Sequence, residues 1–269
     1  MKVRFFSPVC NNPEFIKLQK DTLGKFIQDD YEYIVLNDGL TPELVKEISE
    51  ICETNGIECI EVPKTLIHSS AAVAHCSVMQ WAYDNIILDK HTDDISVFID
   101  AYMFVVREFS VSNFIGDNAI AGLPQYRGPI EYFWPGLLFL NLPKMPSPKD
   151  LSLFCGIVRG YNVDAGGTAW HYLYENRGIP LKAMEHTSHI HSCNSNMHVL
   201  PPPVVEKYDQ EFRVEILESS FLHYGGASTK NFPDRQEKKR QFVEWLLAEC
   251  CNDNILMPKI DYVYKEDSQ

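Results

Sequence analysis

The stretch Ile95-Ser-Val-Phe-Ile-Asp-Ala-Tyr-Met-Phe104 decides the fold that this sequence predicts. Its first five residues carry no charge and are mostly β-branched or aromatic, which is typical of a short strand buried on both faces. The run ends in a single carboxylate, Asp100. Because ligands of open α/β sheets bind outside the carboxyl ends of the strands, Asp100 is expected at the edge where a site forms. The alternative, an aspartate that only caps a turn, remains open.

The chain before this stretch alternates between strand patterns and helix patterns. Strands are expected at residues 3–6, 31–36 and 57–62, and helices at about 13–26, 42–51 and 70–87. Asn12 and Thr41 are expected to cap the first two helices, because each directly precedes a proline and an apolar helical pattern. This alternation predicts parallel strands joined by right-handed helical connections, which is an α/β, Rossmann-like arrangement.

The chain after residue 104 has a different pattern. Two apolar segments, 119–126 and 132–142, are interrupted by proline and glycine and show no helical period. A helix is expected at 168–176, extended chain at 179–190 and 212–217, and a last helix at about 234–250. A single domain with a mixed, mainly parallel central sheet flanked by helices is the simplest prediction.

Composition limits the classes of function. The chain has 269 residues, 45% hydrophobic residues and a formal net charge of −13, so it has ample material for a core and lacks the clustered basic charge of a nucleic-acid binder. No apolar stretch approaches the length of a membrane span, and the N-terminus lacks the pattern of a signal peptide. Eight cysteines without a CxxC pair predict reduced thiols and a cytoplasmic protein.

Several segments resemble a known family when their order and spacing are taken together. They are Leu36-Asn-Asp-Gly39, His75, Phe98-Ile-Asp-Ala-Tyr-Met-Phe104, Trp134-Pro-Gly-Leu-Leu-Phe-Leu-Asn141, Val163-Asp-Ala-Gly-Gly167 and Phe221-Leu-His-Tyr-Gly-Gly-Ala-Ser228. This set resembles the GT-A glycosyltransferases, which use nucleotide sugars, and within them the compact, single-domain type found in some large DNA viruses. The resemblance implies a nucleotide-binding half at 1–104, an acceptor and catalytic half at 105–231, and a C-terminal helix and tail at 232–269.

The resemblance also implies a set of donor-binding residues. Asn37 and Asp38 would hydrogen-bond the base or ribose, His75 would face the nucleotide, and Ser228 and Lys230, after a Gly-Gly turn, would bind the diphosphate. Two alternatives remain open from the residues alone: Asn-Asp-Gly is also a common turn, and a lone histidine on an apolar helix is often a core residue.

A divalent cation is the cofactor that the resemblance implies. The family usually has Asp-X-Asp after this strand, where carboxylate oxygens hold Mn²⁺ or Mg²⁺ against the nucleotide diphosphate. Here the motif reads Asp100-Ala101-Tyr102, so the second carboxylate is absent and metal binding is in question. Asp100 and His223 are the expected metal ligands, and Asp100, Ala101 and Tyr102 are also expected to contact the ribose or the sugar.

Asp164 is the candidate general base for the chemical step. It stands before two glycines at a junction into a helix, where it would take the proton of an acceptor hydroxyl and so invert the anomeric carbon. The alternative is a helix N-cap.

The predicted function is therefore transfer of a sugar from a nucleotide diphosphate sugar, expected to be UDP-linked, to a saccharide or glycan acceptor. Two alternatives remain: a non-catalytic nucleotide-sugar or glycan-binding module, which the missing second acid favours, and a nucleotidyltransferase. The latter usually has a Gly-rich, basic loop soon after the first strand, and residues 7–12 contain neither feature.

Overall fold

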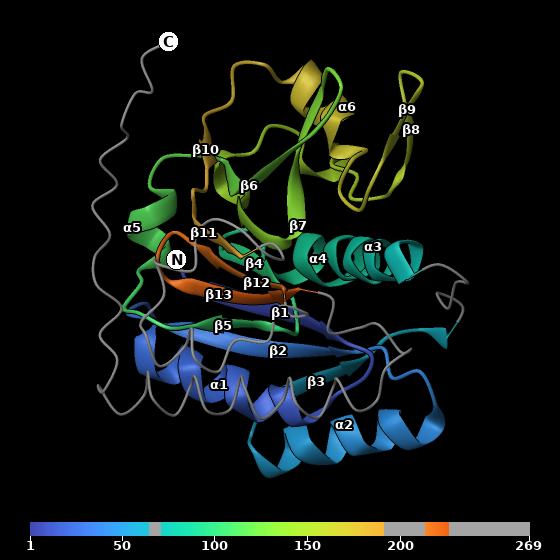
Figure 1. Ribbon diagram of the computed structural model, residues 1–269, viewed down its shortest axis with the longest axis vertical. Helices are drawn as coiled ribbons and strands as arrows, with labels where there is room; N and C mark the ends of the chain where they lie inside the picture. The colour runs from blue at the N-terminus through green and yellow to red at the C-terminus, as the bar shows by residue number, and fades with distance from the viewer. Residues whose placement is uncertain (65–70, 191–212, 226–269) are drawn as a thin grey trace.

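A computed structural model of the chain describes residues 1–64, 71–190 and 213–225 (Figure 1). The expected diphosphate ligands Ser228 and Lys230 and the helix expected at 234–250 lie outside the described residues.

A seven-stranded sheet organises the described chain, in the order β10-β6-β7-β4-β1-β2-β3. Its strands are β1 (Val3–Val9), β2 (Tyr31–Asn37), β3 (Glu58–Glu61), β4 (Ile95–Ile99), β6 (Ile120–Arg127), β7 (Ile130–Asn141) and β10 (Leu181–Ala183). Strand β7 is antiparallel to its neighbours β4 and β6, and the other neighbouring pairs in this sheet are parallel. The prediction of an α/β fold with a mixed, mainly parallel sheet is confirmed.

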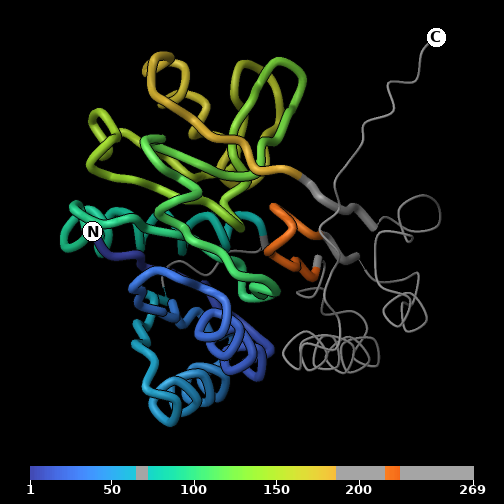
Figure 2. Tube along the Cα trace, turned by 90° about the vertical axis from the view of Figure 1, so that its left-hand side faces the viewer, coloured from blue at the N-terminus to red at the C-terminus, as the bar shows by residue number. Residues whose placement is uncertain are grey.

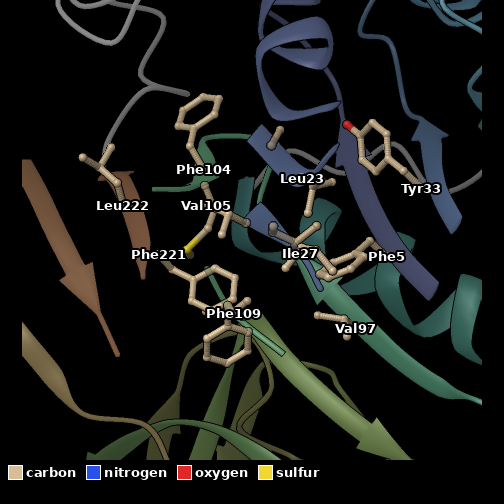
Figure 3. Packing of buried hydrophobic residues seen from close by; sticks show 14 of the residues in the cluster. Phe5, Leu23, Ile27, Tyr33, Val97, Phe104, Val105, Phe109, Phe221 and Leu222 are labelled. Atoms are coloured by element: carbon tan, nitrogen blue, oxygen red, sulfur yellow. The ribbon is translucent and has the colours of Figure 1, made fainter. Parts of the chain in front are cut away.

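Helices cover both faces of the sheet. They are α1 (Glu14–Phe26), α2 (Pro42–Thr54), α3 (Ala71–Ala82), which continues through a π-helical turn at Tyr83–Ile87 into α4 (Leu88–Lys90), then α5 (Val111–Ile115) and α6 (Ala169–Glu175). Successive strand residues point to opposite faces, so Val97 packs with α1 and α2 in one core, whereas Phe98 packs with α3 and α6 in the other. Figure 3 shows part of the first core, where the ring of Phe221 lies against that of Phe109, with the centroids 4.7 Å apart.

A second, smaller sheet brings distant segments together beside the turn after β4. Its order is β11 (His186–Ile190), β12 (Arg213–Leu217), β13 (Phe221–Gly225) and β5 (Met103–Val105). Strand β5 begins directly after Tyr102, and its antiparallel pairing with β13 places His223 opposite Met103. In Figure 2 this β12–β13 hairpin (orange) lies between the blue N-terminal part and the green and yellow part that contains β6 to β10.

Two 3-10 helices, Leu142–Lys144 and Pro148–Asp150, follow β7. A short hairpin, β8 (Gly156–Val158) and β9 (Tyr161–Val163), then leads directly to Asp164. Figure 1 shows this hairpin and α6 side by side at the same end of the molecule.

The starts of the first two helices differ in their capping. Thr41 caps α2 as the sequence predicts, because its Oγ1 accepts a hydrogen bond from Leu44 N at 3.3 Å. The expectation that Asn12 caps α1 is wrong: α1 has Pro13 at its N-cap, and Asn12 stands one residue earlier with a positive φ of 50°. The Asn12 side chain is directed instead to Tyr102.

The carboxyl ends of β2, β1 and β4 meet at one edge of the sheet, because these strands are parallel neighbours. The residues that follow them, Asp38, Cys10 to Asn12, and Asp100 to Tyr102, therefore lie along one line. No helix in the described part of the chain combines the length and the hydrophobicity that a membrane crossing requires.

Candidate active site

Asp100 lies directly after β4 and is held on both sides by backbone hydrogen bonds. Its own N–H donates to the Gly136 carbonyl at 2.7 Å, and its Oδ1 accepts from the Tyr102 N–H at 2.9 Å. One carboxylate oxygen therefore caps the turn, as the alternative reading of Asp100 supposed. The other oxygen, Oδ2, makes no hydrogen bond within the described residues, so the turn fixes Asp100 and leaves one oxygen for a ligand.

His75 lies on α3, where the charges of Asp100 and Asp164 both act on its ring. Burial lowers the pKa of His75, and the two nearby carboxylates partly oppose that shift. The imidazole is therefore held in its neutral form near pH 7. The three side chains come from α3, from the turn after β4 and from the segment after β9, and the fold brings them close enough to interact electrostatically.

Asp164 is exposed and lies outside the helix that follows it. Its Oδ1 accepts from Ala165 N at 2.8 Å, and its own N–H donates to the Tyr132 hydroxyl at 3.2 Å. The alternative reading as a helix cap is wrong, because α6 begins at Ala169 with Thr168 at its N-cap. Asp164 is thus a solvent-facing carboxylate at a fixed backbone position.

Two glycines are required by the turn that follows Asp164. Gly166 has a φ of +82°, and a Cβ there would lie 2.8 Å from the Phe133 carbonyl oxygen. A Cβ at Gly167 would lie 2.2 Å from the Cβ of Val163, well inside contact distance. These glycines therefore let the turn fold back tightly against β7 and β9, which fixes the direction in which the chain presents Asp164.

Tyr102 connects the turn after β4 to the loop after β1. Its buried hydroxyl donates to Asn11 Oδ1 and accepts from Asn12 Nδ2 at 3.0 Å, and its ring packs edge-on against Phe15. Burial raises the pKa of the Tyr102 phenol, so the hydroxyl stays protonated at neutral pH. Sequence reasoning missed this connection, because ninety residues separate Tyr102 from Asn12 and neither residue shows a local signal.

Trp134 and His223 form the wall beside Asp100. Their ring centroids lie 4.8 Å apart, with an angle of 50° between the planes. The indole fits closely over Gly136, where a Cβ would lie 2.2 Å from the ring. Because the Gly136 carbonyl also accepts a hydrogen bond from Asp100 N, the same backbone position contacts both the tryptophan and the aspartate.

The remaining donor-binding candidates have different surroundings. Asn37 is fully buried, and its amide is engaged by the protein: Nδ2 donates to the Val45 carbonyl at 2.8 Å, and Oδ1 accepts from Gly39 N at 3.1 Å. Asp38 is partly exposed at the edge of the sheet, with its N–H donating to the Val9 carbonyl at 2.9 Å. Ala101 is buried within the turn after Asp100.

The donor set near Asp100 does not by itself make a metal site. Among the described side chains, no group of three His, Cys, Asp or Glu residues is placed to share a metal ion. Asp100 and His223 supply one carboxylate and one imidazole, and one oxygen of Asp100 already accepts from the Tyr102 backbone. Tyr102, two residues after Asp100, carries a phenol directed toward Asn11 and Asn12.

Comparison with solved structures gives glycosyltransferases among the similar chains. The galactosyltransferase LgtC in complex with donor and acceptor sugar analogues is 13% identical, with a TM-score of 0.44 over 93% of this chain and 96% of that chain. The mannosyltransferase PcManGT from Pyrobaculum calidifontis, in complex with GDP-Man and Mn²⁺, is 14% identical, with a TM-score of 0.39 over 67% of this chain.

The chain spans 58% of an LgtC active-site mutant and 54% of PcManGT. At these identities and TM-scores, the fold class rests on the strand order and strand directions of the sheet itself. No protein-family model matches the sequence, and no curated protein matches it.

Proposed function

We propose that this protein is a GT-A-type glycosyltransferase that transfers a sugar from a nucleotide diphosphate sugar, a UDP-sugar, to a saccharide acceptor. One observation carries the proposal: Asp100 follows β4 at the carboxyl edge of a mainly parallel sheet, and its charge acts on His75 of α3 together with the charge of Asp164. This edge is where open α/β sheets bind nucleotides, and paired titratable groups there are typical of a catalytic site.

In this proposal the donor lies along the ends of β2, β1 and β4. Asp38 and the loop 10–12 bind the base and the ribose. The Oδ2 atom of Asp100 accepts a hydrogen bond from a hydroxyl of the ribose or of the transferred sugar. The uncharged imidazole of His75 is suited to donate one hydrogen bond to a diphosphate oxygen. His223, Ser228 and Lys230 are assigned to the leaving diphosphate on the basis of the sequence resemblance.

Asp164 is the proposed general base. Its carboxylate takes the proton of the acceptor hydroxyl while that oxygen forms a bond to the anomeric carbon. The bond between the anomeric carbon and the diphosphate oxygen breaks at the same time, the electron pair leaves with the diphosphate, and the configuration inverts. The exposure of Asp164 supports this role, because the acceptor must reach it from solvent.

A non-catalytic nucleotide-sugar or glycan-binding module is the second candidate. Tyr102 favours it, since it replaces the second acid with a buried group that contacts two asparagines. The two candidates share a binding site and differ in turnover. Formation of free nucleotide diphosphate from a nucleotide sugar, by transfer or by slow hydrolysis, therefore distinguishes them.

The test is a thermal-shift series with UDP, GDP, ADP and their sugars, followed by measurement of nucleotide release with each ligand that binds. A ligand that binds only the native state raises the melting temperature, so the largest shift identifies the donor class. A shift with UDP-sugars together with release of UDP is expected. Absence of a shift with every nucleotide would contradict the glycosyltransferase and the nucleotide-sugar-binding module, and would leave only the glycan-binding module.

A further inference from the structure

Two exposed arginines, an exposed tyrosine and a partly buried tryptophan are stacked beside the hairpin that leads to Asp164. Trp170 and Tyr174 of α6 stack with their centroids 4.7 Å apart and an angle of 28° between the planes. The guanidinium of Arg159 lies 5.4 Å from the Trp170 ring, and that of Arg177 lies 3.9 Å from the Tyr174 ring. We call these four residues the arginine ladder.

The two guanidinium groups converge on one ring. Arg159 also lies 5.9 Å from the Tyr174 centroid, so both cations flank the same tyrosine. Stacking on aromatic faces restricts each guanidinium to a few orientations, because the ring quadrupole attracts the cation. The ladder thus brings two positive charges to one tyrosine ring.

Backbone geometry and core packing connect the ladder rigidly to Asp164. Arg159 occupies the two-residue turn between β8 and β9 with a φ of 50°, followed by Gly160 at 86°, which is the geometry of a tight hairpin turn. Trp170 packs on the small core that contains Val163, the residue immediately before Asp164. The proposed base and the ladder are therefore carried by one hairpin and one helix (Figure 1).

Neither guanidinium pairs with a carboxylate of the described residues. Arg159 and Arg177 are exposed and make no ion pair or hydrogen bond within the described residues, although the chain carries a formal net charge of −13. In a strongly acidic protein, two adjacent cations without carboxylate partners concentrate positive potential at one point on a surface that otherwise repels anions.

The neighbouring surface has the side chains that sugars contact. Eight large hydrophobic side chains are exposed in the described residues, and five of them belong to the β6–β7 and β8–β9 hairpins, to the segment before β8, or to α6. These five are Tyr126, Phe154, Ile157, Tyr161 and Tyr174. Saccharide sites combine such apolar, largely aromatic walls with a few fixed polar groups.

We infer that the arginine ladder is an acceptor subsite that selects an anionic saccharide, one that carries a carboxylate or a phosphate group. The inference rests on the proposed function for the identity of the site as an acceptor site. Guanidinium groups bind both anions in a bidentate manner, so the ladder would orient the acid group and direct a neighbouring hydroxyl to Asp164.

The experiment measures saccharide binding directly by titration calorimetry. The probes are a disaccharide that contains a uronic acid, its carboxyl-reduced neutral counterpart and a phosphorylated counterpart. They are tested on the full chain and on the Arg159→Gln/Arg177→Gln variant. A matched control, Lys17→Gln/Lys46→Gln, removes the same charge from α1 and α2, where each lysine pairs with a carboxylate on its own helix.

We expect the wild-type chain and the lysine control to bind at least one acidic probe about tenfold more tightly than the neutral probe. The arginine variant should bind all three probes with similar affinity. The acidic probe that the wild type binds more tightly than the neutral probe identifies the group recognised, either the carboxylate or the phosphate. Equal binding of acidic and neutral probes by the wild type, or no saccharide binding at all, would overturn the inference.

Nucleotide binding separates this inference from the proposed function. A thermal shift with nucleotide diphosphates in both variants, combined with a lost preference for acidic saccharides in the arginine variant alone, supports both. A nucleotide shift without any acidic preference in the wild type rejects the ladder and leaves the proposed function intact. A missing nucleotide shift in the wild type rejects the proposed function itself.

Discussion

The Tyr102 hydroxyl lies 3.0 Å from Nδ2 of Asn12, so the turn after β4 is tied to the loop after β1 across two neighbouring strand ends. The backbone of Tyr102 continues this connection, because its N–H donates to Asp100 and its carbonyl accepts from Tyr224 N at 2.9 Å. Tyr102 therefore positions three parts of the site: the loop 10–12, the carboxylate of Asp100 and the strand that carries His223.

Tyr102→Phe should weaken nucleotide binding about tenfold with little change in the turnover number, since loss of the hydroxyl frees the loop 10–12 while leaving the packing of the ring on Phe15. Titration with the nucleotide identified by thermal shift measures the effect. Tyr83→Phe is the matched control, because its buried hydroxyl also binds the protein, at the Pro148 carbonyl, away from the site. Equal nucleotide affinity in the wild type and in Tyr102→Phe would contradict the positioning role.

Removal of divalent cations should leave nucleotide binding unchanged. Within the described residues, Asp100 and His223 lack a third protein ligand, and the hydroxyl of Tyr102 is engaged by Asn12. The measurement is the affinity for the nucleotide diphosphate in EDTA and in Mn²⁺. A loss of affinity of more than about tenfold in EDTA would show that diphosphate oxygens and water complete a metal site around these two ligands.

Gly167→Ala should destabilise the protein by about 2 kcal/mol, because the added Cβ overlaps Val163 in a turn that is already tightly packed. Gly178→Ala, where the new Cβ meets nothing within 4 Å, is the control and should leave stability nearly unchanged. Denaturant unfolding of both variants gives the comparison. Similar stability in the two variants would show that the turn at Asp164 relaxes freely.

Stability should fall between pH 7 and pH 5, in part because of His75. Its pKa is lowered in the folded state relative to the unfolded value of about 6.5, so at lower pH the unfolded chain binds more protons and stability decreases. His75→Asn should therefore lose less stability over this range than the wild type. His171→Asn, which removes an exposed histidine of α6, is the comparison variant. An unchanged pH slope in His75→Asn would contradict the burial of a neutral imidazole.

The strands and the helices with strong apolar periods could be predicted from sequence because each is a local pattern. The strand at Ile95 and the helix at 168–176 are examples. The paired strands β6 and β7 were visible only as apolar segments without a helical period, since their pairing depends on contacts between segments.

The candidate site was predictable only where a residue type and a strand end coincide, as at Asp100, or where glycines follow an acid, as at Asp164. The partners of these residues were not predictable. The Tyr102–Asn12 contact and the stacking of Arg159 on Trp170 join residues with no local signal, so only the folded chain reveals them.

The central claim is that Asp164 removes the proton from an acceptor in a sugar transfer, and one comparison tests it most directly. Nucleotide release and nucleotide affinity are measured in the wild type, in Asp164→Asn, and in Asp93→Asn, which alters an exposed carboxylate in the turn before β4. We predict that Asp164→Asn lowers turnover by about 10²–10⁴-fold while nucleotide affinity stays within about twofold of the wild type, and that Asp93→Asn changes neither. Unchanged turnover in Asp164→Asn, or an equal loss of turnover and affinity, would contradict the claim.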